Sequence, residues 1–216
     1  MIKALDRREI LRYLGYPAGQ AADPETEELI TQCEAALLDA LRPKWTAGRF
    51  PLRRAGGRLW LGESQLELPG TAIRRHLQDC GECVLFAATL GMEADRLIRQ
   101  AQLASMTRGI VMDACATAFI EAVCDHAETE LNARYGPCSY RFSPGYGDLP
   151  ITLQRRLLTL LDAERKIGLH TTDESLLIPG KSVTAILGLT QAGPRPKSKC
   201  DICQNKERCE FCRHGK

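Results

Sequence analysis

The chain has 216 residues, of which 44% are hydrophobic, and this is enough to bury one sizeable core. Its 29 basic and 27 acidic residues are mixed along the chain and leave a net charge of +2, which excludes a strong field for nucleic acid or an anionic membrane. The N-terminal residues are charged, and no stretch approaches the ~20 apolar residues of a membrane span. We therefore expect a cytoplasmic protein with no nucleic-acid or membrane partner.

The first half of the chain is predicted to pass from helix to sheet. Helical spacing of apolar residues predicts helices over residues 6–15 and 24–42, the second with an acidic first turn. Residues 49–68 alternate apolar and polar side chains around glycines, which predicts short antiparallel strands. A short helix is expected over residues 71–79, and the apolar run 83–91 fits a buried strand.

The second half is predicted to contain a long helix, a loop, a further helix and two strands. The long helix covers residues 93–133, with a break near Ser105 to Gly109, and the loop covers residues 134–150. The further helix covers residues 151–168, with Asp148 as its cap and Pro150 in its first turn, and the strands cover 175–180 and 181–190. Strands and helices do not alternate regularly. The order therefore predicts an α+β fold, with helices packed on a twisted antiparallel sheet.

A cysteine-rich tail follows a linker rich in proline and lysine, so residues 1–192 are interpreted as one domain and 193–216 as linker and tail. Cys200, Cys203, Cys209 and Cys212 form two CxxC pairs. Two such pairs can complete a tetrahedral shell around Zn²⁺ or hold an iron–sulfur cluster. A reduced or redox-active tail is the third interpretation, and the spacing alone leaves all three open.

No motif in the sequence describes a self-contained catalytic centre. GxGxxG, GxxxxGK[ST], GxSxG and HExxH are absent, and so is DxHxxG, by which many corrinoid proteins supply a histidine to cobalt. The third CxxC, Cys80 to Cys83, precedes its strand and so lacks the thioredoxin arrangement. We interpret its thiols, and those of Cys33, Cys115, Cys124 and Cys138, as buried or incidental groups, and we assign no catalytic residue.

The stretch RFSPGY, residues 141–146, combines an arginine, a turn glycine and a tyrosine within one loop. One interpretation is structural, with Arg141 in a surface ion pair and Tyr146 packed on the core. In the other, Arg141 binds a ligand carboxylate, Gly145 lets the backbone approach, and Tyr146 lies against an apolar part of the ligand. A small zwitterion with an attached base would suit this second interpretation.

RFSPGY, the following LDAERKIG and the later TDESLLIPGKSV together resemble the activation domain of cobalamin-dependent methionine synthase. VLFAATLG, residues 84–91, is similar to the stand-alone members of that family. The resemblance implies that the chain binds S-adenosylmethionine. Carried over by position, it implies that Arg141 holds the ligand carboxylate and that Glu121 holds the amino group. Asp113 and Asp125 are weaker candidates for the amino group. The same resemblance implies that Ser143, Gly145 and Tyr146 line the site.

The same resemblance implies an accessory role in methionine biosynthesis. The chain would support reductive methylation of cob(II)alamin on a separate methionine synthase chain, contacting the cobalamin there while flavodoxin or ferredoxin supplies an electron. Such a subunit of a methyltransferase system is not expected to be catalytic alone. The alternative is a metal-stabilised adaptor, or an Fe–S electron-transfer component, for another corrinoid methyltransferase.

Overall fold

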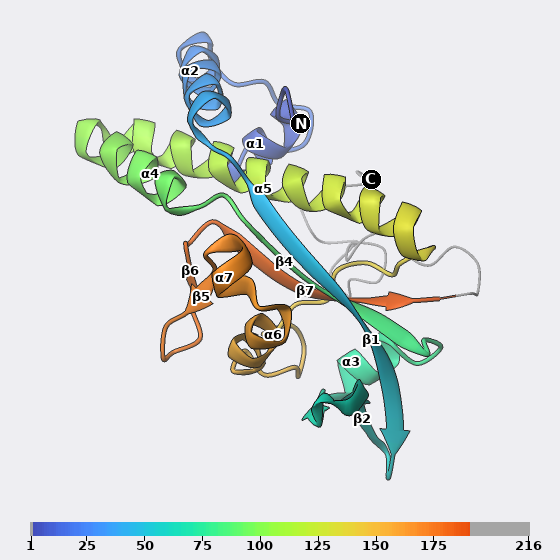
Figure 1. The fold of residues 1–216 in the computed structure, drawn as a ribbon. Helices are drawn as coiled ribbons and strands as arrows, with labels where there is room; N and C mark the ends of the chain where they lie inside the picture. Colours follow the sequence, from blue (N-terminus) through green and yellow to red (C-terminus); the bar gives the residue numbers. More distant parts are fainter. Residues whose placement is uncertain (1, 191–216) are drawn as a thin grey trace.

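The computed structural model describes residues 2–190 and forms an α+β fold, as the sequence predicted (Figure 1). A five-stranded antiparallel sheet has the strand order β3-β2-β1-β4-β7. Its strands are β1 (Lys44–Ala55), β2 (Arg58–Leu61), β3 (Leu66–Glu67), β4 (Glu82–Thr89) and β7 (Ser182–Leu189). A short 3₁₀ helix, η1 (Gly62–Ser64), connects β2 to β3.

Both faces of β4, an interior strand between β1 and β7, are buried, which explains why its sequence is a continuous apolar run. Successive side chains of a strand point to opposite faces of the sheet. Val84, Phe86 and Ala88 therefore enter one core cluster, whereas Leu85 and Ala87 enter a second one. An antiparallel strand covered on only one side would instead alternate apolar and polar residues.

Four helices lie on one side of the sheet, where their buried side chains form the first core cluster with strand residues (Figure 1). They are α1 (Arg7–Tyr13), α2 (Pro24–Ala40), α4 (Met92–Ala104) and α5 (Met106–Tyr135). The predicted break in the long helix is confirmed, because Ser105 lies between α4 and α5 and its side chain accepts a hydrogen bond from the Arg108 N–H. Gly109 permits the close approach of the two helices, since a Cβ there would lie 2.9 Å from the Gln102 Cα.

Three helices cover the second face: α3 (Thr71–His76), α6 (Leu153–Leu161) and α7 (Ala163–Ile167). The single helix predicted over residues 151–168 is therefore wrong. Asp162 adopts left-handed backbone angles, φ 52° and ψ 42°, which end α6 and let α7 start in a new direction. Because the chain changes direction at Asp162, α6 contributes leucines and α7 contributes Ile167 to the second core cluster.

Strand β7 is the last strand of the sheet and positions the loop that carries Arg141. The strand predicted over residues 175–180 is reduced to β6 (Leu177–Ile178), which pairs with β5 (His170–Thr171) in a separate two-stranded sheet.

The linker and the four-cysteine tail predicted over residues 193–216 lie outside the described residues. Within residues 2–190, no helix has the length and apolar character needed to cross a membrane.

Candidate functional site

The segment that carries Arg141 runs antiparallel to the outer side of β7. Phe142 and Ile186 exchange backbone hydrogen bonds of 3.0 and 2.8 Å, and the Ser139 N–H donates to the Gly188 carbonyl at 2.8 Å. Adjacent residues of an extended segment point to opposite sides. Phe142 accordingly enters the second core cluster, while Arg141 points to α5. The pairing with β7 thus fixes the direction of the arginine.

Arg141 lies among three carboxylates of α5. Its Nη2 is 2.9 Å from Glu121 Oε2 and 2.9 Å from Asp125 Oδ1, and its Nε is 3.1 Å from Glu128 Oε1. The acidic residues are spaced at i, i+4 and i+7, which places them on one face of the helix. We call these four side chains the Arg141 cluster.

The guanidinium of Arg141 is largely buried, with 11% of the side chain exposed, and its Nη1 atom is buried without a hydrogen-bond partner among the described residues. A buried donor without an acceptor costs about 1–3 kcal/mol, and more when it is charged. Nη1 is therefore a donor that a ligand carboxylate could satisfy, and this observation fits the ligand-binding interpretation of Arg141.

Electrostatics keep Arg141 charged in spite of its burial. Burial alone would lower its pKa, but the surrounding Cys124, Glu128, Glu121 and Asp125 groups outweigh that effect and raise the pKa above the usual arginine value. Burial raises the pKa of Cys124 to about 12, so this thiol is neutral near pH 7. The charge that stabilises the guanidinium at this pH comes from the three carboxylates.

The loop after Arg141 is held by its own backbone. The Gly145 N–H donates to the Leu149 carbonyl at 2.8 Å, and the Tyr146 N–H donates to the Ser143 carbonyl at 3.1 Å. Gly145 has a φ of +89°, a conformation that glycine adopts without strain. The Tyr146 ring packs edge-on against Phe142 with centroids 6.0 Å apart, yet 39% of the residue is exposed. One side of the ring is fixed and the rest can meet a ligand.

Asp148 corrects the sequence analysis. It was predicted to cap the helix that follows it, but α6 begins only at Leu153. The Asp148 carboxylate instead accepts hydrogen bonds from the Thr71 N–H at 2.5 Å and the Ala72 N–H at 3.0 Å, so it caps α3. These two bonds hold the pKa of Asp148 below its ordinary value. The loop is thereby tied to a helix more than 70 residues earlier in the chain.

Asp113 and Thr117, both in α5, form a second polar group with Lys181. Asp113, a weaker candidate in the sequence analysis, has its Oδ1 atom 2.9 Å from Lys181 Nζ. The Lys181 amine also donates to the Thr117 hydroxyl at 2.7 Å. Asp113 lies eight residues, about 12 Å along the helix axis, before Glu121. It therefore does not join the Arg141 cluster.

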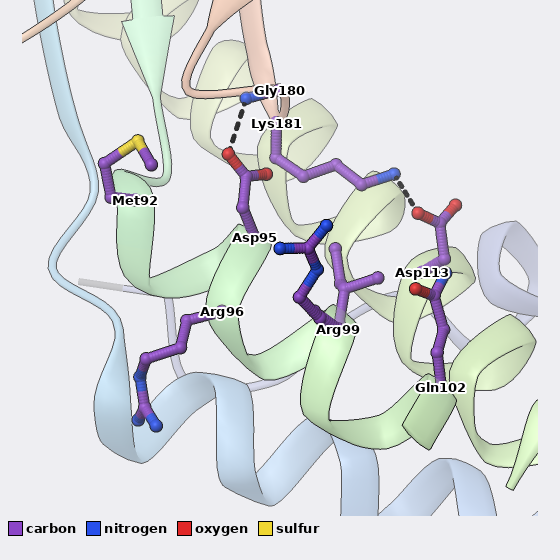
Figure 2. A pocket seen from close by; sticks show the side chains of 9 residues that line it. Met92, Asp95, Arg96, Arg99, Gln102, Asp113, Gly180 and Lys181 are labelled. Carbon is purple, nitrogen blue, oxygen red and sulfur yellow. Dashed lines mark hydrogen bonds and ion pairs between the residues drawn. The ribbon is translucent and has the colours of Figure 1, made fainter. Parts of the chain in front are cut away.

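An open pocket of about 640 Å³ lies beside this lysine (Figure 2). It is lined by Met92, Asp95, Arg96, Ile98, Arg99, Gln102, Asp113, Gly180 and Lys181. Figure 2 shows two interactions across it, the Lys181–Asp113 ion pair and the hydrogen bond of 2.9 Å from the Gly180 N–H to Asp95. Cationic and anionic groups are mixed in this lining, so it favours no single class of ligand.

Five of the six cysteines of the described residues are buried, and Cys138 is half-buried. Cys80 and Cys83 are buried, as the sequence analysis expected, and so are Cys33, Cys115 and Cys124. Burial raises the pKa of Cys115 to about 12, which suppresses the reactive thiolate. Over residues 2–190, no three His, Cys, Asp or Glu side chains are grouped to hold a metal ion. The predicted ligands Cys200, Cys203, Cys209 and Cys212 lie beyond this range.

Glu121 and Arg141, which the sequence analysis assigned to one site, are in direct contact, whereas their role in ligand binding stays a prediction. Ser143, Gly145 and Tyr146 lie on the adjoining loop. Asp125 was only a weaker candidate and Glu128 was not considered. The i, i+4 and i+7 spacing of these acids could have been read from the sequence as one acidic helical face. The spacing alone does not show that Arg141 lies against that face, which the structure shows.

No family model and no curated relative matches the sequence. Among solved structures, the chain is similar to the crystal structure of the MetH reactivation domain bound to AdoHcy, with a TM-score of 0.64. The two are 17% identical, and the match covers 94% of this chain and 80% of the other. Similarity at this level of identity concerns the fold. This chain has the fold of the MetH reactivation domain, the domain of methionine synthase that its sequence resembles.

Proposed function

We propose that this protein binds S-adenosylmethionine at the Arg141 cluster and acts as a stand-alone reactivation subunit for a cobalamin-dependent methionine synthase on another chain. The observation that carries the proposal is the pair of Arg141 and Glu121, 2.9 Å apart, with the buried Nη1 of Arg141 lacking a hydrogen-bond partner among the described residues. The pair lies beside the RFSPGY loop, in the fold of a domain that was crystallised with AdoHcy.

The amino-acid end of the ligand matches the chemistry of this pair. A carboxylate would accept hydrogen bonds from the guanidinium, including Nη1, while an ammonium group would donate to Glu121. The ion pair between Arg141 and Glu121 would thus give way to two ion pairs, one between Arg141 and the ligand carboxylate and one between Glu121 and the ligand ammonium. Asp125 and Glu128 would keep Arg141 oriented during this exchange, because one contacts Nη2 and the other contacts Nε.

The loop supports binding of the remainder of the ligand. Gly145 keeps the backbone free of a side chain at the bend, and the exposed part of the Tyr146 ring offers a surface for an apolar or aromatic group. Phe142 holds that ring from behind. Ser143 contributes its backbone carbonyl to the turn, which fixes the position of Tyr146.

In this role the chain binds and orients a methyl donor and leaves the redox chemistry to its partners. Bound S-adenosylmethionine supplies an electrophilic methyl group for the cobalamin carried by the synthase chain. A cytoplasmic flavodoxin or ferredoxin is the proposed electron donor. Zinc or an iron–sulfur cluster is proposed for Cys200, Cys203, Cys209 and Cys212. Orientation of reactants is itself a recognised source of rate acceleration.

Titration calorimetry with S-adenosylmethionine tests the proposal on the intact protein. We compare the wild type, Arg141→Ala, Arg141→Lys and the control Arg155→Ala, whose side chain pairs with Asp173 elsewhere on the surface. Loss of a charge-assisted contact should weaken binding by about 1.5–3 kcal/mol in Arg141→Ala. Arg141→Lys should recover part of the affinity, because lysine keeps the charge but lacks the planar fork.

The control variant should bind as the wild type does. Absence of binding by the wild-type protein, with or without a cobalamin-loaded synthase chain, would eliminate the methyl-donor role. Equal affinity of the wild type and both Arg141 variants would move the site away from the Arg141 cluster.

A further inference from the structure

Five exposed arginines lie at the end of the sheet that points away from α2 and α4 (Figure 1). The hairpin of residues 52–61, which joins β1 to β2, forms this end, and α3 lies beside it. The hairpin and α3 contain no aspartate or glutamate. We call these two segments the basic arm, and its arginines are Arg53, Arg54, Arg58, Arg74 and Arg75.

Two arginines of the basic arm join the hairpin to α3 through neutral acceptors. Arg54 Nη2 donates to the Leu77 and Cys80 carbonyls at 2.5 and 2.9 Å, just after the end of α3. Arg74 Nη1 donates to the Gly57 carbonyl at 3.1 Å, at the tip of the hairpin. A carbonyl oxygen accepts a hydrogen bond but carries no charge to balance a guanidinium. Both positive charges are therefore still available to a partner.

The remaining arginines add to this charge. Arg53 lies over the ring of Trp60, with its Cζ atom 5.4 Å from the ring centroid, and the two residues are opposite each other in the pairing of β1 with β2. Arg58 forms an ion pair of 3.7 Å with Glu67. Among the described residues, this is the one ion pair that a member of the basic arm makes with a carboxylate. The arm thus has a clear excess of positive charge.

The hairpin presents these side chains in a fixed arrangement. Gly56 and Gly57 form its two-residue turn with φ of +57° and +72°. Positive φ at both positions is typical of a type I′ turn, whose twist matches that of the flanking strands. An element that is already ordered loses little conformational freedom when a partner binds.

We propose that the basic arm is a docking surface for a carboxylate-rich segment of another protein, bound in an extended conformation. The inference does not depend on the proposed function. Arg53 and Arg58 lie on one side of the hairpin, whereas α3 lies on the other side, with the second core cluster. An extended chain can pass from one side over the tip to the other. Each guanidinium can then pair with a carboxylate through two parallel hydrogen bonds.

A nucleic acid fits the basic arm less well than an acidic peptide. Duplex DNA has a persistence length of about 50 nm, so it contacts one side of a narrow hairpin and not both. Single strands bind chiefly by stacking bases on aromatic rings, but Arg53 already occupies a face of Trp60. The net charge of the chain is +2, which supplies no long-range field for a polyanion.

Fluorescence anisotropy with a labelled octaglutamate peptide tests the proposal on the intact protein. The arm variant combines Arg53→Glu and Arg75→Glu, and the control variant combines Arg99→Glu and Arg156→Glu, at two exposed arginines outside the arm. At low salt, the arm variant should bind the peptide at least about tenfold more weakly than the wild type, and the control less than about twofold more weakly. Salt of about 0.5 M should weaken binding by the wild type.

Circular dichroism melting checks that both variants are folded. An equal loss of peptide binding in the two variants would indicate a general charge effect and overturn the proposal. Absence of peptide binding by the wild type at low salt would overturn it as well. Tighter binding of an oligothymidylate of equal charge would assign the basic arm to nucleic acid instead. The arm variant should bind S-adenosylmethionine as the wild type does, so failure of this inference is distinguishable from failure of the proposed function.

Discussion

Arg141 Nη2 lies 2.9 Å from Glu121 Oε2, although 20 residues separate them in the chain. The contact joins the middle of α5 to the segment that follows this helix and returns along β7. Because Asp125 and Glu128 contact the same guanidinium, this arginine attaches the RFSPGY segment to the helix. The cluster therefore combines a structural role with its proposed role in ligand binding.

Replacing Arg141 by methionine should lower the free energy of unfolding by about 1–3 kcal/mol. Loss of one partner from a fully buried ion pair costs ~3–5 kcal/mol, but here the carboxylates are partly exposed to water, which reduces the effect. Urea unfolding followed by circular dichroism measures this change. Arg155→Met is a matched control and should change stability by less than about 0.5 kcal/mol. An equal effect of both substitutions would contradict the structural role of the cluster.

Asp148→Asn should lower the melting temperature at neutral pH, because the amide is a weaker acceptor for the Thr71 and Ala72 N–H groups. The pKa of Asp148 is held below its ordinary value. The carboxylate therefore stabilises the fold at pH values above ~3.9, the usual aspartate pKa, and this contribution is lost as the pH falls through the lowered pKa.

Melting curves at neutral pH and at about pH 3 test this sign, since the difference between the wild type and Asp148→Asn should shrink in acid. Asp173→Asn is a suitable control, because Asp173 is exposed and pairs with Arg155. A difference that grows on acidification would contradict the cap.

Tyr146→Ala should weaken binding of S-adenosylmethionine by about 1 kcal/mol, whereas Tyr146→Phe should bind nearly as the wild type does. The expected loss is that of one aromatic contact, which the phenyl ring preserves. Calorimetric titration of the two variants measures it. If Tyr146→Phe loses as much affinity as Tyr146→Ala, the hydroxyl rather than the ring face contributes to binding.

Cys203→Ser and Cys209→Ser should each remove most of the bound metal from the full-length protein. Each substitution takes one thiolate from a predicted four-ligand set. Elemental analysis and visible absorption of anaerobically purified protein distinguish zinc, which is colourless, from an iron–sulfur cluster, which is brown. Cys138→Ser serves as a control outside the tail. Wild-type protein without bound metal would support a reduced or redox-active tail instead.

Local patterns in the sequence were reliable where one element depends on its own residues. The break at Ser105, the buried strand at residues 82–89 and the helices that begin at Arg7 and Pro24 follow from capping residues and from apolar spacing. The α+β class followed from the order of these elements. The resemblance carried by RFSPGY pointed to the fold that the structural comparison finds.

Local patterns failed where a residue has a distant partner. Asp148 has the sequence context of a cap for the next helix, but its hydrogen bonds go to α3 because the loop folds back over that helix. Asp162 gave no signal of the left-handed conformation that divides α6 from α7. Packing of both helices against one core favours this conformation over a straight helix, and packing of this kind is not encoded within a short window.

The sequence alone determined the α+β class, the main helices and buried strands, and the RFSPGY loop, because capping, apolar periodicity and composition are local properties of the chain. Only the tertiary structure decided that Arg141 points to that acidic face and meets Glu121, Asp125 and Glu128 together. The physical reason is the pairing of Phe142 with Ile186. Pairing at the edge of β7 sets which residues of the segment face α5, and a shift by one residue would turn Arg141 to the other side of the sheet.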